Sequence, residues 1–294
     1  MNTFSIKDIE NLTGIKAHTI RIWEQRYGIL QPKRTPTNIR FYDAGDLKLA
    51  LRIALLNDYG YKISRIHKMN DGDMDSLIQK INDRDFKMHL LVNELLECTF
   101  SMEIDHFEQL LDMNIRKHGT EHTVEQLIFH YLEKVGLMWM TNRISPAQEH
   151  LVSNVIYRKL AVAIENLPKR ERTTMGPSIL LFLPEGEIHD LGLIYIYYLL
   201  MKYNKDPIYL GPNSPVNEVK YIYEVKKPKY MYVHLTSVAN EFDGVKYLNK
   251  LSQNFPGSTI YVSGSMLKNK KYVAHDNLRF FHTLQEAKNE MINL

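Results

Sequence analysis

A glutamate and a histidine separated by one residue form the most chemically informative pattern in this chain. Glu187, His189 and Gly192 directly follow the apolar run Ile179 to Leu183. A carboxylate two residues before a histidine can accept the proton of one ring nitrogen and leave the other nitrogen to face a metal. Gly192 gives a large planar group room to lie close to the backbone. We therefore predict that His189 is a metal ligand and that Glu187 orients its ring.

The composition is that of ordinary folded domains. The chain has 294 residues, of which 44% are hydrophobic and 24% charged, a length that predicts roughly two domains. No run of 18 apolar residues and no signal-peptide pattern occurs, so we expect a cytoplasmic protein without membrane attachment. The single cysteine, Cys98, excludes an internal disulfide and a multi-cysteine metal site.

Charge is distributed unevenly along the chain. Residues 1–70 carry 12 Lys and Arg against 6 Asp and Glu, a net charge of +6, whereas the remainder has a net charge of −3. A small basic head on a mildly acidic body indicates that the head contacts a polyanion.

The basic head has the pattern of a winged helix-turn-helix. Ser5 and Asp8 form a capping box at the start of one helix, and Gly14 separates it from a second helix over residues 16–25. A basic turn and a short extended segment over residues 32–42 then predict a wing, and two more helices are expected at 44–59 and 62–69. We expect DNA contacts from seven residues: Lys16, His18, Thr19, Arg21, Arg34, Arg40 and Tyr42.

Beyond the polar stretch Asn70 to Asp73, which we interpret as a linker, the pattern changes twice. Apolar residues recur at helical spacing over 84–99, 103–117, 121–137 and 146–166, which predicts a four-helix bundle. Five β-rich runs alternating with helices then predict a parallel, flavodoxin-like sheet, whose ligands bind beyond the carboxyl ends of its strands. The runs are Ile179–Leu183, Ile208–Leu210, Tyr230–Leu235, Thr259–Val262 and Leu278–Phe281. The expected domains are a winged helix-turn-helix (1–70), a helical bundle (76–168) and a Rossmann-like sheet domain (175–294).

The head closely resembles the MerR family of winged-helix regulators. The resemblance covers roughly residues 3–70 and is carried by the string Thr19 to Leu30, followed by Pro32, Arg34, Arg40 and Tyr42. It implies binding to double-stranded DNA. The chain lacks the long dimerising helix and the cysteines of MerR metal sensors, so its signal must be of another kind.

The remainder resembles the cobalamin-binding regulators of the CarA/CarH/LitR type. The loop matches their E/D-x-H-x-x-G motif, and Trp139, Glu149 and His150 match their W-x9-E-H motif. The resemblance implies that His189 replaces the dimethylbenzimidazole base as lower cobalt ligand, and that the second motif covers the upper face of adenosylcobalamin. The cofactor-binding residues expected on this basis are Trp139, Glu149, His150, Glu187, His189, Gly192, Ser237, Ser263 and Gly264.

Three positions depart from that pattern. Met140 stands where light-sensing members carry a histidine that can bind cobalt after photolysis. His234 falls where the fold usually has a small serine, although a shift of register would place Thr236 or Ser237 there instead. Ser263-Gly264 replaces a frequent Gly-Gly pair in the pocket that admits the nucleotide tail.

The sequence therefore predicts a DNA-binding transcription regulator, and not an enzyme. As a repressor it would sense cobalamin, and light through adenosylcobalamin, by ligand-dependent assembly into a dimer or tetramer. One alternative is a MerR-like regulator whose sheet domain binds a protein partner independently of cobalamin. A cobalamin-dependent enzyme is the other, which the DNA-binding head and the lack of a separate substrate-barrel sequence disfavour.

Overall fold

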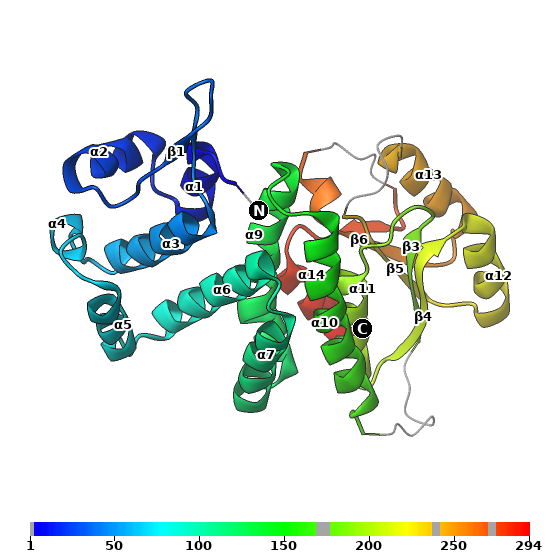
Figure 1. The fold of residues 1–294 in the computed structure, drawn as a ribbon. Helices are drawn as coiled ribbons and strands as arrows, with labels where there is room; N and C mark the ends of the chain where they lie inside the picture. Colours follow the sequence, from blue (N-terminus) through cyan, green and yellow to red (C-terminus); the bar gives the residue numbers. More distant parts are fainter. Residues whose placement is uncertain (1–2, 169–176, 237–241, 270–274) are drawn as a thin grey trace. The chain divides into compact units, whose positions relative to one another are not determined.

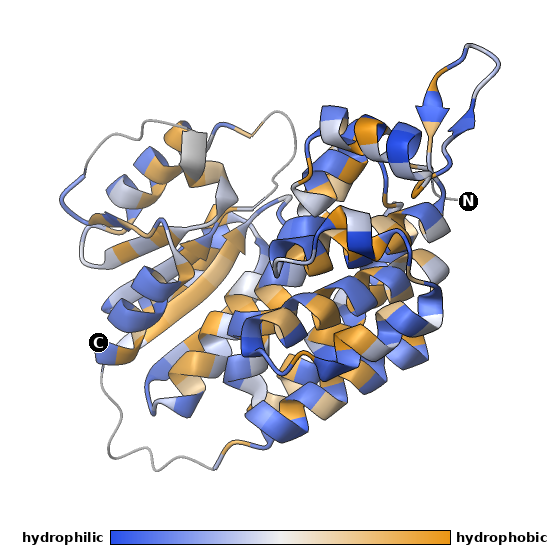
Figure 2. Cartoon of the chain, turned by 90° about the vertical axis from the view of Figure 1, so that its left-hand side faces the viewer, coloured by the Kyte–Doolittle hydropathy of each residue, from blue (hydrophilic) through white to orange (hydrophobic). Residues whose placement is uncertain are grey.

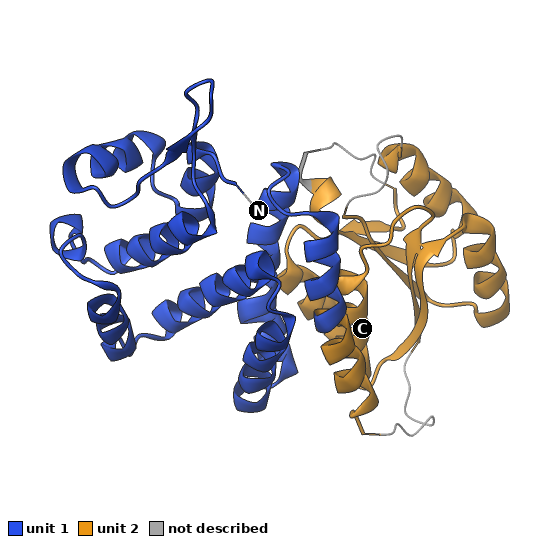
Figure 3. Cartoon of the chain, in the orientation of Figure 1, with its two compact units in different colours: residues 1–155 blue, residues 156–294 orange. Residues whose placement is uncertain are grey.

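The computed structural model describes residues 3–168, 177–236, 242–269 and 275–294 (Figure 1). The chain divides into two compact units, residues 1–155 and residues 156–294, which Figure 3 shows in separate colours. Within the described residues, no helix is both long enough and apolar enough to cross a membrane.

The first unit begins with the predicted winged helix-turn-helix. The capping box of Ser5 and Asp8 opens α1, and Gly14 ends it in the left-handed conformation, with φ of 75°. The wing is a pair of short antiparallel strands in which Lys33 pairs with Phe41. The elements of this region are α1 (Ile6–Thr13), α2 (Ala17–Tyr27), β1 (Lys33–Arg34), β2 (Arg40–Phe41), α3 (Ala44–Asp58) and α4 (Ile63–Ile66). The last helix is a single turn, shorter than predicted.

The predicted linker at Asn70 to Asp73 was wrong. Asn70 instead caps α5 (Asp71–Lys80), and its side chain accepts a hydrogen bond from the backbone of Asp73 while the Asp73 carboxylate accepts one from Asn70. Polar residues that are typical of loops are also the preferred helix caps, so composition alone does not separate the two. Apolar residues of α5 join a core with α3, α4 and Phe86, and Trp23 packs against it.

The predicted helical bundle follows. Its members are α6 (Arg84–Ser101), α7 (Ile104–His118), a continuous stretch formed by α8 (Thr120–Thr123), the π-helical turn η1 (Val124–Ile128) and α9 (Phe129–Met140), and α10 (Pro146–Glu165), whose first half belongs to the first unit. Tyr131 is fully buried here, and its hydroxyl lies 2.6 Å from the hydroxyl of Thr99.

The second unit holds the predicted five-stranded parallel sheet. Its order is β4-β3-β5-β6-β7, the flavodoxin-like arrangement. The strands are β3 (Ser178–Pro184), β4 (Asp206–Ser214), β5 (Tyr230–His234), β6 (Thr259–Ser263) and β7 (Leu278–Phe280). The helices are α11 (Leu191–Lys202), α12 (Val216–Lys226), α13 (Gly244–Asn254) and α14 (Leu284–Asn293), with the 3-10 turn η3 (Ser265–Asn269).

Successive side chains along each strand point to opposite faces of this sheet. Leu180 and Phe182 of β3 pack in one core with residues of α12 and α13, and α11 and α14 contact each other on the opposite side (Figure 1). The three inner strands, β3, β5 and β6, are accordingly buried along most of their length, and Figure 2 shows hydrophobic strand segments in the sheet in orange. Burial on both faces leaves the ends of the strands as the place where polar side chains gather.

Candidate functional site

The loop that leaves β3 is held in place by backbone hydrogen bonds. Gly186 donates to the side-chain oxygen of Asn213 at 2.9 Å, and the Asn213 amide donates to the Glu187 carbonyl at 3.0 Å. Glu187 also donates to the Pro184 carbonyl at 3.0 Å. The loop is thereby fixed to the end of β4 before it enters α11.

The carboxylate of Glu187 is fully buried and holds the ring of His189. Its Oε1 lies 2.7 Å from His189 Nδ1 and 2.9 Å from the His189 amide nitrogen, and its Oε2 accepts a hydrogen bond from the Thr236 amide at 3.1 Å. Because an ionised carboxylate only accepts hydrogen bonds, this contact places a proton on Nδ1. The basic lone pair is then on Nε2, at the far side of a ring that is 38% exposed. This is the geometry of an imidazole prepared to bind a metal.

A second acidic side chain beside this loop was not anticipated from the sequence. Asp190 precedes α11 and accepts a hydrogen bond from the Tyr209 hydroxyl at 3.1 Å. Burial raises the pKa of Asp190, although the bond from Tyr209 acts in the opposite direction. Tyr209 lies on β4, 19 residues from Asp190, so no local sequence pattern predicts their contact.

The structure places His234, not Thr236, opposite Gly192. His234 ends β5 in register with Ser263 at the end of β6, and its Nδ1 lies 2.7 Å from Ser263 Oγ. A Cβ atom on Gly192 would lie 2.5 Å from His234 Nε2. Thr236 uses its backbone amide on Glu187, and Ser237 lies outside the described residues.

Gly264 directly follows Ser263, and no residue with a Cβ atom can replace it unless the backbone moves. Its φ is 115°, and a Cβ atom there would lie 2.1 Å from the carbonyl oxygen of Leu235. The ends of β5 and β6 therefore approach each other closely at this edge.

The site offers one imidazole donor, His189, which fits a metal whose other ligands come from a cofactor. Across the residues that the structure describes, no group of three His, Cys, Asp or Glu side chains could hold a metal ion. A single well-oriented imidazole suits a metal already bound in a planar macrocycle, which needs only an axial ligand. His189 fits the cobalt of a corrinoid in this respect.

The first unit carries the second set of predicted cofactor residues. Trp139 and Met140 end α9 with 39% and 72% of their surfaces exposed. On α10, the carboxylate of Glu149 accepts a hydrogen bond from Ser153 and lies 3.0 Å from Nδ1 of His150. Glu149 and His150 thus repeat the carboxylate–histidine relationship of the loop after β3.

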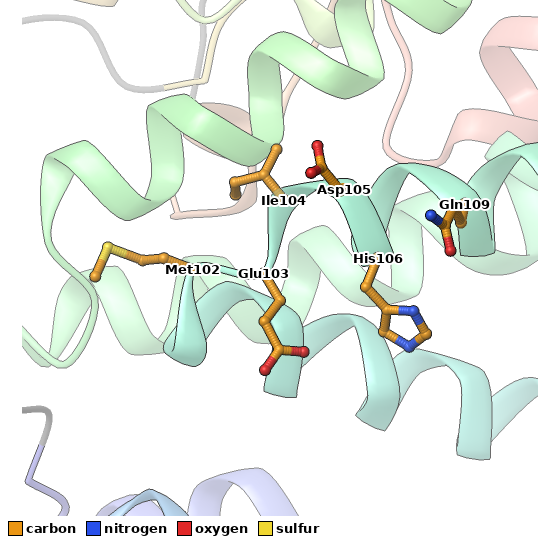
Figure 4. A pocket seen from close by; sticks show the side chains of 6 residues that line it. All are labelled: Met102, Glu103, Ile104, Asp105, His106 and Gln109. Atoms are coloured by element: carbon orange, nitrogen blue, oxygen red, sulfur yellow. The ribbon is translucent and has the colours of Figure 1, made fainter.

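A surface hollow of about 420 Å³ at the start of α7 contains none of the predicted site residues. Its lining side chains are shown in Figure 4: Met102, Glu103, Ile104, Asp105, His106 and Gln109. Asp105 points away from the side chains of Glu103 and His106 in this view, so the polar groups do not converge on one point. We assign no function to this hollow.

Most of the predicted DNA contacts lie on accessible surface. Lys16, His18, Arg21 and Arg34 are exposed, whereas Thr19 is partly buried. Arg40 is partly buried too, with its Nε 3.4 Å from Glu24 Oε2. Arg34 donates to the side-chain and backbone oxygens of Asn38 at 2.7 and 3.2 Å, which braces the turn of the wing.

The prediction that Tyr42 contacts DNA was wrong. Its side chain is fully buried, its backbone forms a two-way bridge with Phe4, and its hydroxyl donates to Glu24. Burial raises the pKa of this hydroxyl further above its usual value. Tyr42 joins the wing to the core of the head, and Glu24 ties Tyr42 and Arg40 together.

Comparison with known proteins finds two family models that match this chain. The model of the MerR HTH family regulatory proteins matches residues 4–72, and a model described as B12 binding domain matches residues 91–164. The HTH-type transcriptional repressor CarH of Myxococcus xanthus is 24% identical over 278 residues, which are 92% of each chain. CarA of the same organism is 26% identical over 219 residues, 72% of this chain and 69% of that one.

This chain is homologous to CarH and CarA. It combines a MerR helix-turn-helix region with a B12 binding domain, the parts of a cobalamin-binding transcription regulator, as predicted. The fold resembles that of the monomethylamine corrinoid protein of Methanosarcina barkeri, with a TM-score of 0.51, 13% identity, and coverage of 69% of this chain and 97% of that one. At that identity the likeness concerns the fold alone.

Proposed function

We propose that this protein is a transcriptional repressor that binds double-stranded DNA through residues 3–70 and cobalamin through His189. The buried carboxylate of Glu187, which fixes the ring of His189 through Nδ1, is the observation that carries the proposal. CarH and CarA are both named transcriptional repressors, which supports a regulator over an enzyme.

The residues of the loop after β3 would bind the cofactor and orient the ring of His189. Nε2 of His189 would hold the cobalt, and the hydrogen bond from Nδ1 to Glu187 would keep Nε2 unprotonated. The Thr236 amide bonds the Glu187 carboxylate and Asn213 bonds Gly186 and the Glu187 carbonyl, so contacts within the protein position the ring. When bound in its adenosyl form, the cofactor supplies a carbon–cobalt bond that light can cleave.

We propose adenosylcobalamin as the physiological form. The exposed indole of Trp139 offers a broad apolar face to an adenosyl group, and the oxygens of Glu149 can accept further hydrogen bonds from ribose hydroxyls. Assembly that depends on the cofactor would strengthen DNA binding, because several weakly binding heads then act at high effective concentration. On this proposal, illumination would weaken both the assembly and the binding to DNA.

The decisive experiment is a dark titration of the full chain with adenosylcobalamin, followed by absorption spectroscopy. Wild-type protein should give the spectrum of a histidine-ligated, base-displaced corrinoid, and His189→Ala should bind more weakly and lack that spectrum. His89→Ala is the matched control, because His89 is exposed on α6 and belongs to neither motif. Equal affinity and equal spectra for wild type and His189→Ala would refute the assignment.

Assembly is measured separately by light scattering on the same samples. The mass should rise when adenosylcobalamin is added in the dark and fall after illumination. An unchanged mass with bound cofactor would remove ligand-dependent assembly from the proposal and leave cobalamin binding itself intact.

A further inference from the structure

The imidazole of His234 is held at the ligand edge of the sheet by a chain of hydroxyl groups. Its Nδ1 lies 2.7 Å from Ser263 Oγ, and the same oxygen lies 2.5 Å from the hydroxyl of the buried Tyr232. Both contacts join β5 to β6 within the second unit. The ring is therefore anchored and does not sweep freely over the end of β5.

This ring fills the space above the first turn of α11. A Cβ atom on Gly192 would lie 2.5, 2.7 and 2.9 Å from the Nε2, Cδ2 and Cε1 atoms of His234. All three nearest atoms belong to the imidazole. The ring of His234 therefore occupies the space that a side chain at position 192 would take. On the adjoining side, Gly264 lies tightly against the backbone of Leu235.

Cobalamin would need space at this edge. It carries a nucleotide tail that ends in a planar base, and the base is displaced from cobalt when a protein histidine takes the lower position. An aromatic ring cannot approach neighbouring carbon atoms much closer than about 3.5 Å. No such clearance exists between Gly192 and His234 in this structure.

We propose that His234 is a specificity-determining residue that closes the sheet edge to the nucleotide tail. This chain would then recognise a corrinoid by its ring and upper ligand, and would accept corrinoids with different lower bases or none. The inference rests on the proposed function, because it presupposes a corrinoid bound through His189.

The surroundings of His234 favour this closed arrangement. Burial lowers the pKa of His234 to about 4, although the charge of Glu187 acts in the opposite direction, so the ring is neutral at physiological pH. A neutral imidazole can form its hydrogen bond to Ser263 through Nδ1. Swinging the ring away would forfeit that bond, which corresponds to roughly a two- to tenfold loss of affinity for any ligand that requires it.

The test compares adenosylcobalamin with adenosylcobinamide, which lacks the nucleotide, on the full chain in the dark. The measured quantity is the ratio of the two dissociation constants, obtained by spectrophotometric titration. His234→Ser removes the ring and should shift this ratio at least about tenfold in favour of adenosylcobalamin, because the tail can then be buried. His234→Asn, which is also smaller than histidine and can still bond Ser263, should shift the ratio in the same direction.

The control is His89→Ser on the exposed surface of α6, for which the ratio should equal that of wild type. Thermal melting identifies which of the two His234 variants is folded, and either one suffices. An unchanged ratio in a folded His234 variant would overturn the inference while leaving His189 ligation in place. If wild type binds neither corrinoid, the proposed function is refuted, and the inference is refuted with it.

Discussion

The guanidinium Nε of Arg143 lies 2.7 Å from the carboxylate of Asp8, which joins the loop after α9 to the first helix of the DNA-binding head. Asp8 is almost fully buried and belongs to the capping box of α1. Close by, Lys134 of α9 donates a hydrogen bond to the Leu12 carbonyl near the end of α1, at 3.1 Å. Helix α9, whose last turn carries Trp139, and the loop after it therefore contact the helix-turn-helix through one cationic side chain each, Lys134 and Arg143.

Loss of the Arg143 contact should destabilise the first unit. Arg143→Ala would leave the buried carboxylate of Asp8 without its cation and the Thr3 carbonyl without its 3.1 Å donor, at an expected cost of about 1–3 kcal/mol. Urea unfolding followed by circular dichroism measures this loss. Arg116→Ala, on the exposed surface of α7, should change stability by less than about 0.5 kcal/mol. Equal effects of the two substitutions would show that the ion pair contributes nothing.

Periodicity predicted the architecture well, because apolar spacing and sheet burial are local consequences of sequence. The four bundle helices and the five strands lie where the pattern placed them. A linker was predicted at Asn70 in place of helix α5 because capping residues and loop residues have the same chemistry, and only the packing of Met74 and Ile78 against α3 distinguishes them.

Only part of the site was predicted, because only contacts between residues close in sequence can be inferred from the sequence. Glu187 and His189 are two residues apart, so their contact could be inferred locally, whereas the Thr236 amide that donates to the second oxygen of Glu187 comes from the segment after β5. Tyr42 was misassigned because a tyrosine beside a basic wing resembles a DNA contact until its burial is known. Contacts that depend on strand order require the structure.

The fixed orientation of His189 should depend on the charge of Glu187. In Glu187→Gln, the amide NH2 would face one of the N–H donors that now point at the carboxylate, so the ring would lose its restraint. Cobalamin affinity should fall roughly 10- to 100-fold. Glu185→Gln removes an exposed charge two residues away and should bind as wild type. Titration by absorbance distinguishes the two, and equal losses would mean that general loop charge, not the Glu187–His189 bond, is responsible.

DNA binding should weaken when an exposed cation of α2 is removed. Arg21→Ala is the preferred variant, because Arg40 is partly buried beside Glu24 and its loss would also disturb the head. If Arg21 contacts a phosphate, the slope of log K against log salt should fall in magnitude by about 1. Gel-shift titrations on the promoter region at several salt concentrations provide the slope, with Arg116→Ala as control. A slope identical to that of wild type would exclude a phosphate contact by Arg21.

The stability of the second unit should fall on mild acidification. The pKa of His234 is lowered to about 4 by burial, below the value of about 6.5 for an unfolded histidine. Between these values the unfolded chain binds more protons than the folded one, so stability is lost as pH decreases from about 6.5 towards about 4. His234→Asn should flatten the dependence of the melting midpoint on pH in this window, whereas His89→Asn should not. Parallel pH profiles for wild type and His234→Asn would contradict this origin.

Trp139 should distinguish corrinoids by their upper ligand. Its indole is 39% exposed at the end of α9, which leaves a broad apolar ring face accessible to a ligand. Trp139→Ala should weaken adenosylcobalamin binding roughly tenfold and leave methylcobalamin binding nearly unchanged, since only the adenosyl group is large enough to stack on the ring. Leu137→Ala is the matched control, because Leu137 lies on the same helix and is 38% exposed. Dissociation constants measured in the dark for both corrinoids decide the outcome. If Trp139→Ala weakens the two corrinoids equally, the indole supports the fold of the bundle and does not read the upper face.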